Sequence, residues 1–183
     1  MPNLPENKPK PTEGLLNAAR QAGRKGPPPV HLWNPPFCGD LDMEIRADGT
    51  WFYQGTPIGR PEMVRLFASI LRRDGDDYFL VTPVEKVGIR VVDAPFVAVD
   101  AEFGDDITFE TNLGEYVVAG ADHPITVNIS DGTPRPYLHV RRGLTALIDR
   151  KTFYRLADKA APGADGSLGV TSGGAFFPLE GPK

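Results

Sequence analysis

The most unusual chemistry in the sequence lies in a proline-stiffened loop, Trp33-Asn34-Pro35-Pro36-Phe37-Cys38-Gly39-Asp40. An aromatic ring beside a side-chain amide can stack on a planar ligand and hydrogen-bond it, so Trp33 and Asn34 are candidate ligand-binding residues. The same loop allows a second interpretation, in which it covers a sheet edge and buries Trp33 and Phe37 in the core. The sequence leaves both interpretations open.

Four basic side chains are the other candidates for ligand binding. Arg60 and Arg150 each stand just before a predicted helix, where a guanidinium can grip a phosphate or carboxylate through two hydrogen bonds. Each could equally pair with an acidic side chain and join its helix to the sheet. Lys86 and Arg90 lie on one predicted strand of mixed charge, whose simpler interpretation is a solvent-exposed face.

The sequence lacks the common catalytic motifs. It contains no G-x-x-x-x-G-K-[ST] phosphate loop, no G-x-G-x-x-G and no G-x-S-x-G. Its three histidines are scattered, and nothing in the sequence supplies a base for Cys38. Asp40 and Asp42 could bind Mg²⁺, but alternation along a strand places both on its solvent side. We therefore assign no catalytic residue, no metal site and no cofactor.

Composition narrows the class of protein. The single cysteine excludes an internal disulfide and fits a reducing compartment, and no apolar run could span a bilayer. The N-terminus has no apolar segment typical of a secretion signal, so we expect a cytoplasmic protein. The net charge is −4, divided into +3 over residues 1–30 and −7 over the remainder. An acidic body disfavours DNA or RNA as a partner.

The chain is expected to divide into a tail and two subdomains. Residues 1–29 are predicted to form a flexible, basic, proline-rich tail with a short helix that either docks on a partner, packs on its own protein or frays. Residues 30–94 are predicted to form an α+β subdomain with a hairpin at Asp48-Gly49 and a helix over 61–72. Residues 95–183 are predicted to be strand-rich, with a helix over 149–160 that Asp149 caps.

The two predicted helices resemble each other. A shift of ninety positions places Ile58, Arg60, Arg65 and Leu66 on Ile148, Arg150, Arg155 and Leu156. Val81-Thr82 and Val170-Thr171 follow the helices at similar positions, in predicted strands. These matches favour a duplicated unit and predict that both helices superpose with their flanking strands. The fold class is therefore α+β, with two related, antiparallel subdomains that each contain one main helix.

Several segments resemble the bacterial family catalogued as domain of unknown function 1285. They are Trp33-Asn34-Pro35-Pro36, Gly39-Asp40-Leu41-Asp42-Met43, Asp48-Gly49-Thr50-Trp51-Phe52-Tyr53, Gly55-Thr56-Pro57-Ile58, Leu66-Phe67 and Tyr78-Phe79-Leu80-Val81-Thr82-Pro83-Val84-Glu85-Lys86. The resemblance runs from about Val30 to Leu179. It implies two related subdomains, the second superficially like a pleckstrin-homology domain, with a nucleotide-type ligand between them and a role in signal transduction.

Three classes of function follow from these observations. A module that binds a nucleotide-type small molecule is the first, with Trp33, Asn34, Arg60, Lys86, Arg90 and Arg150 as its predicted site at the junction of the subdomains. A protein-interaction or structural domain without a small-molecule ligand is the alternative. An enzyme is the least favoured, because only scattered acids and histidines remain for acid–base chemistry.

Overall fold

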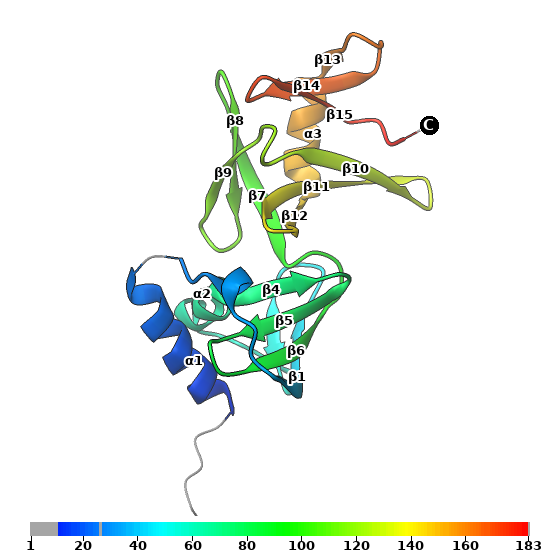
Figure 1. Cartoon of the computed structure of the whole chain (residues 1–183). Helices are drawn as coiled ribbons and strands as arrows, with labels where there is room; N and C mark the ends of the chain where they lie inside the picture. The colour runs from blue at the N-terminus through cyan, green and yellow to red at the C-terminus, as the bar shows by residue number, and fades with distance from the viewer. Residues whose placement is uncertain (1–10, 26, 183) are drawn as a thin grey trace, which may run out of the picture. The chain divides into compact units, whose positions relative to one another are not determined.

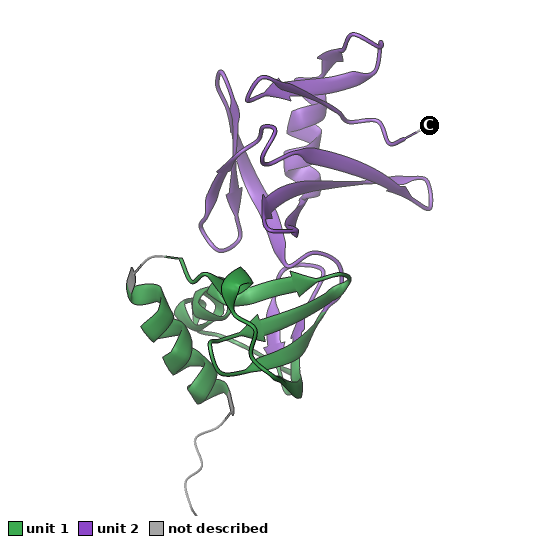
Figure 2. Ribbon diagram, in the orientation of Figure 1, with its two compact units in different colours: residues 1–43, 53–90 green, residues 44–52, 91–183 purple. Residues whose placement is uncertain are grey.

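The computed structural model describes residues 11–25 and 27–182. These form two compact units: unit 1 is the described residues up to 43 together with residues 53–90, and unit 2 is residues 44–52 and 91–182 (Figure 2). Helices and strands occur in both, so the predicted α+β class is confirmed (Figure 1). Among the described residues no helix is long and apolar enough to cross a membrane.

The helix predicted in the N-terminal tail is α1, Pro11–Ala22. Its residues Leu15, Leu16 and Ala19 are buried, and it contacts helix α2 of the same unit. Among the alternatives for this helix, packing on its own protein is therefore the one observed. Two short 3₁₀ helices follow, η1 at Gly23–Lys25 and η2 at Val30–Leu32; residues 1–10 lie outside the described part of the chain.

Residues 37–91 form one six-stranded sheet and one helix. Their elements are β1 Phe37–Ile45, β2 Trp51–Tyr53, β3 Thr56–Pro57, α2 Pro61–Ser69, β4 Leu71–Asp74, β5 Asp77–Val81 and β6 Lys86–Val91. The strand order is β3-β2-β1-β6-β5-β4. Two three-stranded meanders are thus joined through β1 and β6, and α2 is the connection between the meanders.

The predicted helix over 61–72 is too long by three residues. Pro61 opens it and Glu62 lies in its first turn, as expected, but the helix ends at Ser69. Leu71 instead pairs with Leu80 in the sheet, and Asp74 pairs with Asp77 across a hairpin turn at Gly75, whose φ is +63°. The pairing with β5 overrides the helical spacing of the apolar residues at this point.

Residues 96–178 form a second six-stranded sheet, a helix and a small third sheet. The elements are β7 Phe96–Phe103, β8 Ile107–Thr111, β9 Tyr116–Val118, β10 Ile125–Ser130, β11 Thr133–Arg141, β12 Leu144–Ile148, α3 Arg150–Asp158, β13 Ala161–Pro162, β14 Leu168–Ser172 and β15 Ala175–Pro178. The large sheet has the order β10-β11-β12-β7-β8-β9, and the small one β13-β14-β15. The sequence predicted an antiparallel sheet. The observed sheet is mixed instead, because β12 pairs with β7 in parallel.

The start of α3 is as predicted. The carboxylate of Asp149 accepts a hydrogen bond of 2.8 Å from the main-chain N–H of Thr152. This contact satisfies one of the N–H groups that have no partner within the first turn of a helix. The helix buries Thr152 and Leu156 and ends at Asp158, two residues before the predicted end.

The duplication is visible in the order of elements. A three-stranded meander, a helix and a second three-stranded meander occur as β1–β3, α2 and β4–β6, and again as β10–β12, α3 and β13–β15. The two predicted helices hold the same place in this order, which confirms the repeated halves. In the second copy the two meanders remain in separate sheets, and β10–β12 joins β7–β9 instead. Superposition of the copies and the pleckstrin-homology likeness stay predictions.

Candidate functional site

The side chain of Arg72 attaches the loop that contains Trp33 to strand β4. The guanidinium of Arg72 donates from Nη1 to the carbonyl oxygens of Trp33, at 2.7 Å, and Val30, at 3.0 Å. The Trp33 side chain is half-buried and Asn34 is exposed. Arg72 therefore positions the main chain of this loop, a role that the sequence did not reveal.

Lys86, another predicted site residue, belongs to the same network. Its ammonium lies 2.9 Å from Oδ2 of Asp74 and 4.1 Å from the centre of the Phe79 ring. Arg72 grips the same carboxylate through Nε, at 2.9 Å, and Nη2, at 2.8 Å. The hydrogen bond from Arg72 is the main cause that lowers the pKa of Asp74. Lys86 thus has an anionic partner within its own unit.

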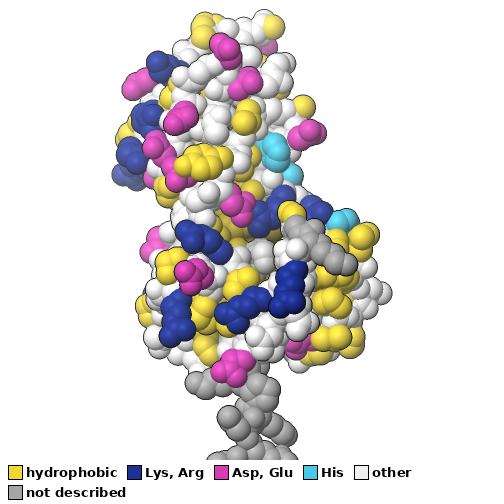
Figure 3. Space-filling view, turned by 90° about the vertical axis from the view of Figure 1, so that its left-hand side faces the viewer, with side chains coloured by type: hydrophobic (Ala, Val, Ile, Leu, Met, Phe, Trp, Pro, Cys, Tyr) yellow, Lys and Arg dark blue, Asp and Glu magenta, His cyan; other side chains and the backbone are white. Residues whose placement is uncertain are grey.

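The other two arginines predicted in unit 1 differ from each other. Arg90 forms an exposed ion pair with Asp42, at 2.8 Å between Nη2 and Oδ1, and so lies on a solvent-exposed face, the simpler interpretation given for it. Arg60 is exposed at the N-cap of α2. On the face drawn in Figure 3, basic side chains gather over the lower body among hydrophobic side chains, with fewer acidic ones between them.

Arg150, the sixth predicted residue, lines a cavity of about 690 Å³ within unit 2. Four segments form it: the hairpin residues Ala47 and Asp48, the start of β7, residues 133–136 of β11, and residues 147–150, 153 and 154 around the start of α3. Its side chains include Val97, Arg135, Arg150, Phe153 and Tyr154. Basic, aromatic and apolar groups therefore meet in one concave surface.

The cavity exists because β11 is longer than its neighbour β12. The last pair between them is Tyr137 with Leu147, so residues 133–136 lie beyond the paired part of the two strands. Pro134 and Pro136 lie in this extension, and a proline has no N–H that would need a partner there. The chain then enters α3, which brings Arg150 and Tyr154 beside the extended part of β11.

The acidic side chains of the cavity already have partners. Asp149 caps α3, and Asp48 accepts a hydrogen bond of 2.9 Å from the N–H of Thr50, the main cause that lowers the pKa of Asp48. Arg150 is exposed and has no ion pair among the described residues. Tyr154, one turn further along α3, is 61% exposed. The cavity can therefore accept an anionic group at Arg150 and a planar group on Tyr154.

The second arginine of the cavity is tied to an acid. Arg135 forms an ion pair between Nη2 and Oδ2 of Asp93, and its Nε donates to the hydroxyl of Tyr137 at 3.4 Å. The Tyr137 hydroxyl in turn donates to Oδ1 of Asp93 at 2.6 Å. Hydrogen bonding to Tyr137 and Asp93 raises the pKa of Arg135, and burial raises that of Tyr137.

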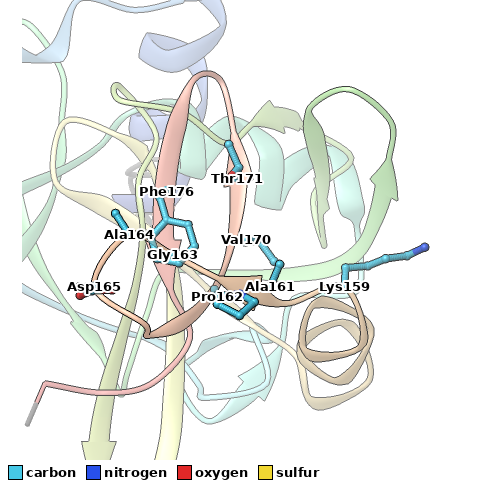
Figure 4. Close-up of a pocket in the computed structure, with 10 residues that line it drawn as sticks. Lys159, Ala161, Pro162, Gly163, Ala164, Asp165, Val170, Thr171 and Phe176 are labelled. Atoms are coloured by element: carbon cyan, nitrogen blue, oxygen red, sulfur yellow. The ribbon is translucent and has the colours of Figure 1, made fainter.

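Two other cavities are less suited to an anion. One of about 410 Å³ in unit 1 contains Asp40, Asp77 and Lys86, whose ammonium is already bound to Asp74. The other, of about 600 Å³ in unit 2, is drawn in Figure 4. It is lined mainly by small or apolar residues, and its charged residues are Lys159 and Asp165.

The possible metal ligands and Cys38 are the remaining groups considered from the sequence. Among the residues that the structure describes, no group of three or more His, Cys, Asp or Glu side chains could hold a metal ion. Cys38 is exposed, and its Sγ lies 3.4 Å from the carbonyl oxygen of Pro36. No acid, base or cation contacts it in the described part of the chain.

Comparison with known proteins decides the family. Residues 28–94 match the model for the N-terminal domain of the family described as domain of unknown function DUF1285, and residues 95–179 match the model for its C-terminal domain. The chain belongs to the DUF1285 family. No curated protein matches this DUF1285 protein.

Two crystal structures of the same family are similar to this DUF1285 protein. The family member from Silicibacter pomeroyi DSS-3 is 61% identical, covers 91% of this chain and 94% of its own, and has a TM-score of 0.81. The member from Shewanella baltica OS155 is 33% identical, covers 65% of this chain and 92% of its own, and has a TM-score of 0.54. The predicted family and its two-part architecture are therefore confirmed.

Proposed function

We propose that this protein is a ligand-binding module and that the cavity beside α3 takes a planar, anionic small molecule of the nucleotide type. The observation that carries the proposal is Arg150, a guanidinium without an ion pair among the described residues, in one cavity with Tyr154. A phosphate fits the guanidinium and an aromatic base fits the phenol ring. The volume of the cavity is in the range usual for small-molecule sites.

The function that follows is sensing, not turnover. None of the common catalytic motifs is present in the sequence, and the acids of the cavity are engaged by main-chain N–H groups. A bound ligand would stabilise unit 2, and that change is what a cytoplasmic signalling module could report. The earlier set of Trp33, Asn34, Arg60, Lys86 and Arg90 stays a separate prediction, because only Arg150 belongs to this cavity.

Calorimetric titration of the full chain with ADP and AMP tests the proposal. We expect Arg150→Ala to weaken binding about tenfold or more, because a hydrogen-bonded charged contact is lost. Lys151→Ala is the matched control, since Lys151 is the next residue of α3, is exposed and does not line the cavity. Equal affinity of Arg150→Ala and wild type, or failure of both nucleotides to bind, would overturn the proposal.

The aromatic part of the site needs its own comparison. Tyr154→Phe retains the ring and should bind ADP nearly as tightly as wild type. Tyr154→Ala removes the ring and should lose about 1–3 kcal/mol of binding free energy, the usual contribution of stacking on a base. If both variants bind like wild type, the base does not stack on this residue.

A further inference from the structure

The arginine–acid pair of the cavity lies at the segment that follows unit 1 along the chain. Asp93 belongs to residues 92–95, between the end of β6 and the start of β7. Its side chain is 17% exposed, and both of its oxygens accept hydrogen bonds from β11, one from Arg135 and one from Tyr137. These two contacts fasten the segment to the sheet of unit 2.

Arg135 also faces the proposed ligand. It lines the cavity, and its side chain is 39% exposed. A guanidinium has five N–H donors, and the observed contacts use only Nε and Nη2. Within the described residues Nη1 has no hydrogen-bond partner, so this group of Arg135 is available to an anion in the cavity.

We infer that an anionic ligand in this cavity competes with Asp93 for Arg135, and that ligand binding loosens the attachment of residues 92–95 to β11. This inference rests on the proposed function. One guanidinium has a single positive charge, and two anions that share it repel each other and divide its attraction. The coupling between ligand and Asp93 is therefore negative, and it must be reciprocal.

The burial of Asp93 explains why loss of its ion pair with Arg135 would loosen the attachment of residues 92–95. A mostly buried carboxylate that loses its cationic partner keeps only the hydrogen bond from Tyr137. An ionised group in that position is stabilised by turning toward water. The next residue, Ala94, is buried, so we expect a movement of Asp93 to be felt where the segment packs in the core. Binding of the ligand therefore changes how firmly the segment between β6 and β7 is attached to β11.

The reciprocal effect can be measured with ADP and the full chain. Asp93→Asn removes the competing charge, so we expect it to bind ADP about tenfold more tightly than wild type. Tyr137→Phe weakens the hold on Asp93 and should shift affinity in the same direction by less. Asp100→Asn is the control, because Asp100 forms a similar pair with Arg155, which, unlike Arg135, does not line the cavity.

Hydrogen exchange at residues 92–94 gives the second readout. Saturating ADP should speed the exchange of these amides in wild type, and Asp93→Asn should show fast exchange without ADP. Suppose that Arg150→Ala loses binding, as the proposed function expects. If Asp93→Asn and Tyr137→Phe then both bind ADP with wild-type affinity, or if ADP slows the amide exchange, the inference is wrong and the proposed function stands. If Arg150→Ala binds as wild type does, or ADP does not bind, the proposed function fails and the inference fails with it.

Discussion

Arg72 donates a hydrogen bond of 2.7 Å to the carbonyl oxygen of Trp33, 39 positions earlier in the chain. The Arg72 side chain is only 15% exposed and makes three further hydrogen bonds, one to Val30 and two to Asp74. One side chain thus joins the loop after η2 to strand β4. The family motif around Trp33 depends on an arginine that lies outside it.

Replacement of Arg72 should destabilise the protein. We expect Arg72→Ala to lower the free energy of unfolding by about 2 kcal/mol, because two carbonyl groups and a carboxylate lose a charged donor. Chemical denaturation measures the change. Arg73→Ala, the next residue of β4, is the control and should cost less than Arg72→Ala, since Arg73 pairs with the fully exposed Asp76 and its contacts with the carbonyl oxygen of Gly75 and the Tyr78 ring are local. Similar losses in both variants would show that Arg72 has no special role.

The same network predicts a dependence of stability on pH. Asp74 has a lowered pKa in the folded state, chiefly through its hydrogen bond from Arg72, whereas an unfolded aspartate has a pKa of about 3.9. The stabilisation is therefore present above the unfolded pKa and is lost as the pH falls through the folded pKa. Asp74→Asn should be less stable than wild type at neutral pH, and the difference should shrink in strong acid. A difference that grows on acidification would contradict the assignment.

The cap of α3 predicts a smaller effect. Asp149→Ala removes the acceptor for the N–H of Thr152 and should lower the free energy of unfolding by about 1 kcal/mol. Asp149→Ser keeps an acceptor and should recover most of the loss. Asp158→Ala, at the other end of the helix, should be neutral or slightly stabilising, because an acid is unfavourable near a helix C-terminus. Destabilisation by both alanine variants would point to general fraying of α3.

Glycine 169 provides a test of close packing in the small sheet. A Cβ at Gly169 would lie 2.2 Å from the carbonyl oxygen of Phe177 and 2.7 Å from the ring of Phe176, so Gly169→Ala should cost about 1–3 kcal/mol. Gly59→Ala is the matched control, because nothing lies within 4 Å of its Cβ position. That variant should be neutral or stabilise by up to about 1 kcal/mol. Thermal unfolding of both variants measures these changes in stability. A Gly169→Ala variant as stable as wild type would show that β14 and β15 separate easily.

Local signals in the sequence predicted most of the elements. The hairpin at Asp48-Gly49 and the cap at Asp149 each depend on one or two neighbouring residues, and both are present. The predicted end of α2 was wrong. The helix stops earlier because Leu71 pairs with Leu80 in the sheet, and a tertiary contact of this kind leaves no local signal in the sequence. The parallel pairing of β12 with β7 joins distant segments, and no local pattern indicates it.

The candidate site was predictable only in part. Arg150 was proposed from its position at the start of a helix and lines the cavity as the first residue of α3, whereas Arg90, for which an exposed face was the simpler interpretation, forms an exposed ion pair with Asp42. Arg135 and Tyr154 were missed, because their place in the cavity depends on how far β11 extends past β12. The available signal was Pro134 and Pro136, which alternate with Arg135 in a strand and indicate a stretch without a pairing neighbour on one side.

The parallel pair also constrains the order in which the protein can be assembled during synthesis. Residues 96–98 of β7 pair with 146–148 of β12, so this contact closes a loop of fifty residues. During synthesis the edge of β7 that pairs with β12 stays unpaired until Ile148 has left the ribosome. Each meander, in contrast, can form as soon as its own three consecutive strands have been made. We expect the meanders to form first and the centre of the second sheet to close last, in a slow step set by chain entropy.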